Sequence, residues 1–119
     1  MLTGYRASGF GAVVILTALL PSWQIALDSA NKSPQTIKDY VASVRKLATF
    51  LQDHGMPDDL EAVDAEHILA FLVEERERTS AASAQKHYRN LHIYFRWIKD
   101  EGERAAPNPM DRGREARGA

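Results

Sequence analysis

The sequence predicts one all-α domain, and three observations support this fold class. Apolar residues recur at three- and four-residue steps over residues 33–55 and again over residues 83–102. No stretch shows the strict alternation of a half-buried strand, and no internal repeat is present. With 119 residues the chain is long enough for a single core. Because it has no cysteine, it has neither a disulfide framework nor a thiolate metal site.

We expect the first residues, 1–18, to be an apolar N-terminal extension whose removal costs little stability. Residues 10–20 are uncharged but too few to cross a membrane, which takes about 20 apolar residues. A secretory signal is disfavoured because Pro21 follows where a cleavage site of small residues would be needed. We therefore expect no membrane partner and a cytoplasmic location.

A short helix should follow this extension, capped by Ser22 and ending near Ala30. Its apolar residues should turn toward the core. They are Trp23, Ile25, Ala26 and Leu27. A turn at Asn31 and Lys32 then leads into the first long helix.

The first long helix has clear start and stop signals. Ser33 is a good N-cap, Pro34 suits the first helical position, and Gly55 supplies the left-handed residue that commonly follows a helix. A continuous apolar stripe should face the core. The stripe consists of Ile37, Tyr40, Val41, Val44, Leu47, Ala48 and Leu51. Lys38 and Arg45 lie one heptad apart on a separate polar flank.

The next segment connects to a third helix. Leu60 and Val63 should enter the core, although Pro57 and several acids disfavour regular structure around them. Asp64 should cap a helix that runs to about Arg78. The buried side of that helix should consist of Ile68, Leu69, Phe71 and Leu72.

The last long helix should begin at Ser80 or Ser83 and end at Gly102. Its predicted core stripe is Ala84, Tyr88, Leu91, Phe95 and Ile98, flanked by His87 and Tyr94. Ile93 and Trp97 lie on a second apolar side, which we assign to contact with the short helix near the N-terminus. The helical domain would then span residues 19–104. Residues 105–119, with two prolines and a Gly/Arg/Ala tail, are typical of an unfolded linker.

Nothing in the sequence indicates an active site, a cofactor or a metal. The histidines are not spaced as ligands, since His87 and His92 are five apart and diverge on a helix. A Gly-rich phosphate loop, an HExxH motif and a nucleophile elbow are all absent. Paired acids such as Glu74 and Glu75 are typical of a solvated helix face. We expect no catalytic residues, no cofactor and no metal site.

The charge distribution is more informative than the net charge of −1. Residues 56–79 hold eight acids, whereas residues 80–99 hold four cations and no acid. Cations spaced along a helix can follow a phosphate backbone, and hydroxyls and N–H groups at helix N-termini also favour phosphate. The candidate DNA-binding residues are Ser33, Thr36, Lys38, Arg45, Ser83, Lys86, Arg89 and Arg96. Ordinary surface cations on amphipathic helices explain the charges equally well.

Short motifs, taken in their order, resemble the N-terminal core-binding domain of tyrosine recombinases, the phage integrase family. A Ser-Pro-x-Thr helix start, a Tyr four residues later, a final Phe-x-Trp helix ending in Glu-Gly, and an Asn-Pro pair recur in that family. Here they are Ser33, Pro34, Thr36, Tyr40, Phe95, Trp97, Glu101, Gly102, Asn108 and Pro109. The resemblance covers about residues 19–112. It implies a four- to five-helix, SAM-like bundle of two helical hairpins that clamps double-stranded recombination-site DNA.

The resemblance also implies that a catalytic half is missing. In the family that half follows the Asn-Pro linker and supplies an Arg, a Lys, a His-x-x-Arg motif, a further His or Trp, and the nucleophilic Tyr. This chain ends ten residues after Pro109. We therefore expect a truncated integrase that binds DNA without catalysis, with other recombinase subunits as further partners in DNA recombination. Two alternatives stay open: a helical protein-interaction domain that docks through Ile93, Trp97 and the apolar N-terminus, and a non-functional integrase remnant.

Overall fold

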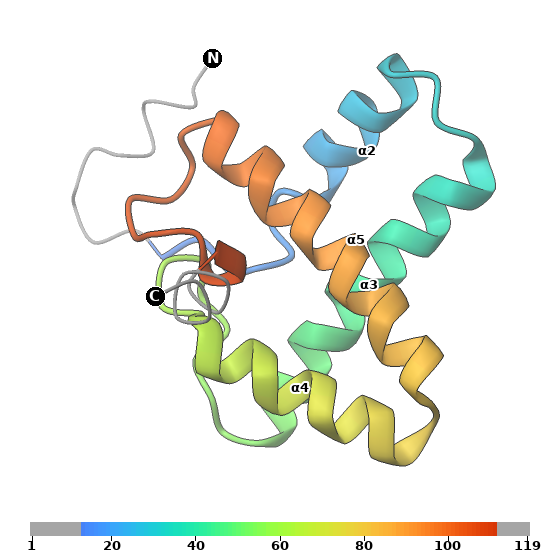
Figure 1. Ribbon diagram of the computed structural model, residues 1–119. Helices are drawn as coiled ribbons and strands as arrows, with labels where there is room; N and C mark the ends of the chain where they lie inside the picture. Colours follow the sequence, from blue (N-terminus) through green and yellow to red (C-terminus); the bar gives the residue numbers. More distant parts are fainter. Residues whose placement is uncertain (1–12, 112–119) are drawn as a thin grey trace.

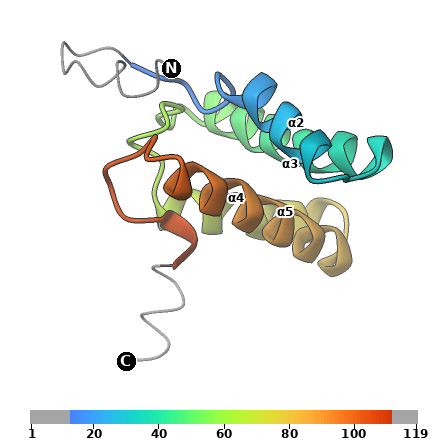
Figure 2. The same cartoon turned by 90° about the horizontal axis from the view of Figure 1, so that it is seen from above.

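The computed structural model describes residues 13–111, of which residues 109–111 are helical, and four helices precede them. They are α2 (Leu20–Ser29), α3 (Pro34–Asp53), α4 (Ala65–Arg78) and α5 (Ala81–Asp100). Helices α2 and α3 form one hairpin and α4 and α5 the other; Figure 2 shows the hairpins as two stacked layers, and in Figure 1 α5 crosses in front of α3. The predicted all-α class is confirmed. Within the described residues the only pairing of extended backbone is an isolated bridge between Ile15 and Asp59.

Both ends of α3 follow their sequence signals. The Ser33 side chain accepts a hydrogen bond from the Thr36 N–H at 3.1 Å, and Pro34 is the first helical residue. Beyond the helix, Gly55 has φ +66°, the left-handed conformation that glycine adopts without steric cost. Asn31 makes the turn between α2 and α3 with φ 65°, which asparagine tolerates better than most residues. The predicted start and stop of this helix are confirmed.

The caps of the second hairpin are also those the sequence predicts. The Asp64 carboxylate accepts from the Glu66 N–H at 3.0 Å, while the Asp64 N–H donates to Nδ1 of His67 at 3.0 Å. This is a reciprocal capping arrangement in which histidine takes the place usually held by Glu or Gln. Of the two predicted starts of α5, Ser80 is right, because its hydroxyl accepts from the Ser83 N–H at 3.0 Å.

The predicted stripe of α3 lies in the core. Its fully buried members are Val41, Val44, Leu47, Ala48 and Leu51, and its partly buried members are Ile37 and Tyr40. Helix α3 buries two further residues that the stripe did not include, Ser43 and Phe50. Leu60 and Val63 enter the core from the segment before α4, as expected.

Three predicted core residues point to solvent instead. Ile25 of α2, Leu69 of α4 and Tyr88 of α5 are 69%, 52% and 38% exposed. On α5 the two flanking residues, His87 and Tyr94, take the buried positions. The buried face of α5 is therefore rotated relative to the prediction, since this helix packs on α3 and α4 and also meets α2.

Helix α2 is joined to α5 through aromatic rings. The Trp23 ring lies 4.7 Å from the Tyr94 ring and 6.4 Å from the Trp97 ring, measured between centroids. Trp97 thus faces the short helix as predicted. The helix begins at Leu20 without a side-chain cap, so the predicted cap at Ser22 is wrong.

The expected N-terminal extension is part of the packing from residue 13 onward. Leu16 is fully buried, and its backbone N–H donates to the Asp58 carbonyl at 2.8 Å. The Tyr94 hydroxyl donates to the Leu16 carbonyl at 2.6 Å. Removing the chain through Thr17 would open the core, contrary to our expectation from the sequence. Residues 1–12 lie outside the described part of the chain.

The expected unfolded linker is likewise not observed over residues 105–111. The Arg104 guanidinium donates to the backbone carbonyls of Leu60, Val63 and Pro107, and Met110 is buried. Residues 104–111 therefore form a strap that lies against the domain. Residues 112–119 are outside the described range, and the division of the chain at residues 18 and 104 remains a prediction.

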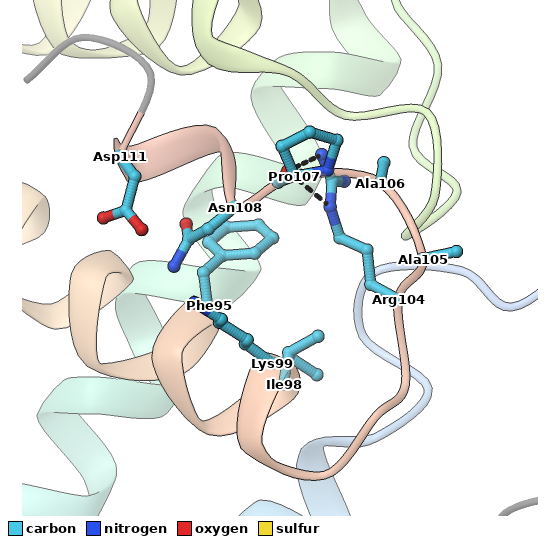
Figure 3. Close-up of a pocket in the computed structure, with 9 residues that line it drawn as sticks. All are labelled: Phe95, Ile98, Lys99, Arg104, Ala105, Ala106, Pro107, Asn108 and Asp111. Carbon is cyan, nitrogen blue, oxygen red and sulfur yellow. Dashed lines mark hydrogen bonds between the residues drawn. The ribbon is translucent and has the colours of Figure 1, made fainter. Parts of the chain in front are cut away.

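The strap encloses a pocket at the end of α5. Figure 3 shows Arg104 and Pro107 on one side of it and Phe95 and Ile98 of α5 on the other. The Arg104 guanidinium carbon lies 6.0 Å from the centre of the Phe95 ring, within the range of a cation–π contact. Polar contacts to carbonyls and this ring contact together hold the strap against the helix.

We expect Phe95→Ala to destabilise the domain by roughly 3–5 kcal/mol, because it removes a fully buried aromatic ring and leaves a cavity. Thermal or urea unfolding measures this loss. Tyr88→Ala on the same helix is the control and should cost much less, since Tyr88 is partly solvated. An unchanged melting temperature for Phe95→Ala would mean that α5 is rotated differently.

Candidate nucleic-acid interface

The N-terminal halves of α3 and α5 meet through polar side chains. Asn90 donates to the Asp39 carboxylate at 3.2 Å and to the Ser43 hydroxyl at 3.0 Å. The Lys86 ammonium lies 3.4 Å from the other Asp39 oxygen. In both Figures 1 and 2 the N-terminal ends of the two helices lie on the same side of the molecule. The fold therefore brings Ser33, Thr36 and Lys38 toward the side of the molecule that carries Ser83, Lys86 and Arg89.

Most of the predicted hydroxyls are already used inside the protein. The Ser33 hydroxyl accepts from the Thr36 N–H and donates to the Thr36 hydroxyl at 3.0 Å. The Ser83 hydroxyl is turned inward and lies 3.4 Å from a Glu75 oxygen, to which it donates. Ser33 thus acts as the predicted N-cap, whereas the contact of Ser83 with Glu75 was not predicted.

The candidate cations do not all lie on one face of the molecule. Ser43 marks the side of α3 that contacts α5, and Arg45 lies about 160° around the helix from it at about 100° per residue. By the same geometry Lys38 lies about 140° away. Arg89 and Arg96, both exposed, lie within about 20° of one another on the outer side of α5. Lys86 stands between the two sets, because it contacts Asp39 of α3.

Arg45 lies in grooves on the outer side of α3. One groove, between α2 and α3, is lined by Lys38, Arg45 and Asp28 among others. The other, between α3 and α4, also includes Lys46 and Phe71. Of the predicted cations, Lys86 and Arg89 lie in the N-terminal half of α5, where Lys86 contacts α3 through Asp39.

A buried ionic group connects α3, α4 and α5, and we did not predict it. Glu75 is only 2% exposed, and its carboxylate lies 3.0 Å from Arg78, 3.6 Å from Lys46 and 3.6 Å from Nε2 of His87. Nδ1 of His87 lies 2.7 Å from the Ser43 hydroxyl. The expectation that Glu75 belongs to a solvated acidic face is therefore wrong. The one sequence feature that could have indicated a buried polar group was the position of His87 beside the core stripe of α5.

The pKa values of this group follow from burial and charge. Burial by itself raises the pKa of Glu75, but Lys46 and Arg78 more than offset this, so the pKa lies below its ordinary value. Burial lowers the pKa of His87, and the nearby Lys86 and Lys46 act in the same direction against the opposing charge of Glu75. Glu75 is therefore ionised and His87 neutral near pH 7.

Several acids of the acid-rich segment are engaged within the protein. Asp58 accepts from Gln52 at 3.0 Å, Glu61 accepts from backbone N–H groups of the strap, and Asp64 caps α4. The segment that precedes α4 lies at the end of the molecule opposite the N-termini of α3 and α5 in both views (Figures 1 and 2). The fold thus separates these acids from Lys86 and Arg89.

Comparison with protein-family models matches residues 19–102 to the phage integrase N-terminal SAM-like domain. The chain belongs to this family. The match spans all four described helices and confirms the SAM-like, integrase-type fold predicted from the short motifs. No curated protein and no solved structure matches the chain significantly.

The tyrosines of this integrase-family domain are not arranged as nucleophiles in the described part of the chain. Tyr94 is fully buried, and its hydroxyl donates to the Leu16 carbonyl. Burial and the charge of Glu103 raise the pKa of its phenol well above the ordinary value. Tyr40 packs its ring on Trp23 at 5.9 Å between centroids. These contacts give Tyr94 and Tyr40 structural roles.

The described part of the integrase-family domain has neither a candidate membrane span nor a cluster of metal ligands. Over residues 13–111, none of the helices combines the length and apolar character that a membrane span requires. In the same range, no group of three or more His, Asp or Glu side chains is placed to hold a metal ion.

The buried ionic group should make the stability of the fold depend on pH. Because the pKa of His87 is lower in the folded chain than its ordinary 6.5, the unfolded chain takes up a proton first as pH falls. The contribution of neutral His87 to the free energy of unfolding should be fully present above pH 6.5. It should be lost as pH falls below 6.5 and through the lower pKa that His87 has in the folded chain. The depressed pKa of Glu75 adds a loss in the same direction below its ordinary 4.5.

Melting temperatures of wild type and His87→Gln across this range measure the effect. The variant should lose the decline that begins below pH 6.5, whereas His92→Gln, on the same helix, should retain it. Equal pH profiles for wild type and His87→Gln would contradict the assignment.

Proposed function

We propose that this chain is the DNA-binding, core-binding half of a tyrosine recombinase, which holds double-stranded recombination-site DNA through phosphate contacts. Membership in the phage integrase N-terminal family carries this proposal. The position of Lys86 and Arg89 in the N-terminal half of α5, on the side of the molecule where the N-termini of α3 and α5 both lie, supports it. A role on DNA also agrees with our expectation of a cytoplasmic location and with the absence of cysteine.

The contacts would have unequal weight. Lys86 and Arg89 would form the centre of the interface, with Lys38 and Arg96 at its borders. The N-terminal turn of α3, where Thr36 lies, would offer the positive end of the helix dipole to a phosphate. Arg45, on the outer side of α3, would reach DNA only if the duplex extends around that helix. Ser33 and Ser83 would act by shaping the two helix starts.

Binding by this half alone should be weak and dependent on salt. Non-specific protein–DNA complexes have dissociation constants of ~10⁻⁴–10⁻⁶ M at physiological salt, because their affinity comes from counterion release. The overall charge of −1 gives no long-range attraction, so the local separation of cations from acids must supply it.

If Lys38, Lys86, Arg89 and Arg96 each neutralise one phosphate, log K should fall with log salt at a slope of about −3.6. Arg89→Ala should weaken binding to all duplexes alike and flatten the slope by about one unit. Fluorescence titration of labelled duplex DNA at several salt concentrations measures both quantities.

Arg76→Ala is the matched control, because Arg76 is an exposed arginine on α4 beside Leu69 and Tyr88. It should leave affinity and slope unchanged. A flat slope for the wild type, or identical losses for both variants, would contradict the proposed interface.

The chain should bind without cutting or joining DNA. Among the described tyrosines, Tyr94 and Tyr40 are engaged in packing. Tyr88 lies in a mostly apolar groove that includes Arg76 but no cluster of cations that could stabilise a phosphoryl transition state. Incubation with a nicked suicide duplex should therefore give no covalent protein–DNA adduct on a denaturing gel. An adduct would contradict this, most clearly one that disappears in Tyr94→Phe.

A second candidate function is docking of another protein, such as a further recombinase subunit. Exposed apolar residues Leu69, Val73 and Tyr88 line a groove between α4 and α5, and Ile93 is also partly exposed. Trp97, which we expected at such an interface, packs against Trp23 instead. If the chain shows no salt-dependent DNA binding but self-associates or binds a protein partner through Leu69, this function gains support.

A further inference from the structure

One acid lies within the proposed DNA-binding interface itself. Asp39 is on α3, and its carboxylate lies 3.4 Å from the Lys86 ammonium, with the two side chains 38% and 44% exposed. The neighbouring stretch of α5 is otherwise free of acids from residue 80 to residue 99. Asp39 therefore places a negative charge directly beside Lys86, one of the two cations at the centre of the proposed interface.

Asp39 is held in this position by the protein. The Asn90 side chain, which is buried, donates to the Asp39 carboxylate at 3.2 Å and approaches the Asp39 backbone carbonyl at 3.4 Å. Asn90 is itself fixed by its hydrogen bond to Ser43 in the buried network. The carboxylate therefore cannot turn away from an approaching ligand without breaking contacts to both Asn90 and Lys86.

A fixed carboxylate at such a place has two consequences. It repels phosphates and reduces the charge that Lys86 can offer to them, which lowers affinity for every duplex alike. It also keeps acceptor capacity, since a carboxylate has about four lone-pair sites and Asn90 and Lys86 occupy only part of them. An acceptor on a helix suits donors at base edges, and in the major groove the N4 amino group of cytosine is the donor that Asp and Glu accept from.

Resting on the proposed function, we infer that Asp39 is a specificity-determining residue. Its carboxylate accepts a hydrogen bond from the N4 amino group of a cytosine in the major groove, while Lys86 beside it contacts the adjacent backbone. Affinity for non-specific DNA is thereby exchanged for discrimination at one base pair. Phosphate contacts by Arg89 and its neighbours would position the duplex for this contact.

Selection of bound duplexes from a randomised double-stranded library tests the inference, with the full chain as wild type and as Asp39→Asn. The substitution removes the charge but keeps an oxygen that can accept from Asn90. The wild type should enrich cytosine at one position with a preference of ~5-fold or more, the lower limit expected for a good base contact. Asp39→Asn should lose that preference and bind unselected duplex more tightly, with a steeper salt slope.

Asp53→Asn is the matched control. Asp53 is an exposed acid on the same helix, about 21 Å farther along it at 1.5 Å per residue, so the net charge change is identical. This variant should keep the cytosine preference. Tighter binding in both variants to the same extent would identify a general charge effect and overturn the inference.

Lys86→Gln tests whether the effect of Asp39 on binding depends on its ion pair with Lys86 or on a general change in folding. Lys86→Gln should weaken binding to unselected duplex more in the Asp39→Asn background than in wild type, because Asp39 partly neutralises Lys86. Melting temperatures confirm that each variant is folded. Salt-dependent binding without an enriched base, or with the same base in Asp39→Asn, overturns the inference alone. Absence of salt-dependent binding by the wild type overturns the proposed function as well.

Discussion

The crossing of α3 and α5 depends on a polar contact at its centre. Ser43 is buried on α3 and lies 2.7 Å from Nδ1 of His87, whose other ring nitrogen faces Glu75. Buried polar groups are costly unless they are hydrogen-bonded, so this contact permits few other arrangements of the three helices. This contact joins the α2–α3 layer to the α4–α5 layer, and the strap and the aromatic rings of α2 pack against the two layers so joined.

Two acids of this domain illustrate how burial decides the role of a charge. Glu75 is enclosed, and its charge is compensated by Lys46 and Arg78, so it serves the packing of α4. Asp39 forms an ion pair with Lys86 and is 38% exposed, so its charge is available to a ligand. Both connect to Ser43, through His87 and Asn90 respectively, which links the interior to the proposed interface.

The helices were predictable because their signals are local. Ser33, Asp64 and Ser80 cap the helices that the sequence assigned to them, and Gly55 follows α3 in the expected conformation. Such signals act between residues three or four apart, so they do not require knowledge of the partners. The family match over residues 19–102 agrees with the order of these motifs.

By itself, the sequence determined that the chain is helical, where the long helices begin and end, and which apolar stripe of α3 faces the core, although not the burial of Ser43 and Phe50. The tertiary structure alone decided the rotation of α5, the inward position of Glu75, the burial of Leu16 and the docking of Arg104 on backbone carbonyls. Helical periodicity gives only the direction of an apolar face. Which side of a helix with two neighbours is buried, and which charge finds a buried partner, depend on contacts between residues far apart in the chain.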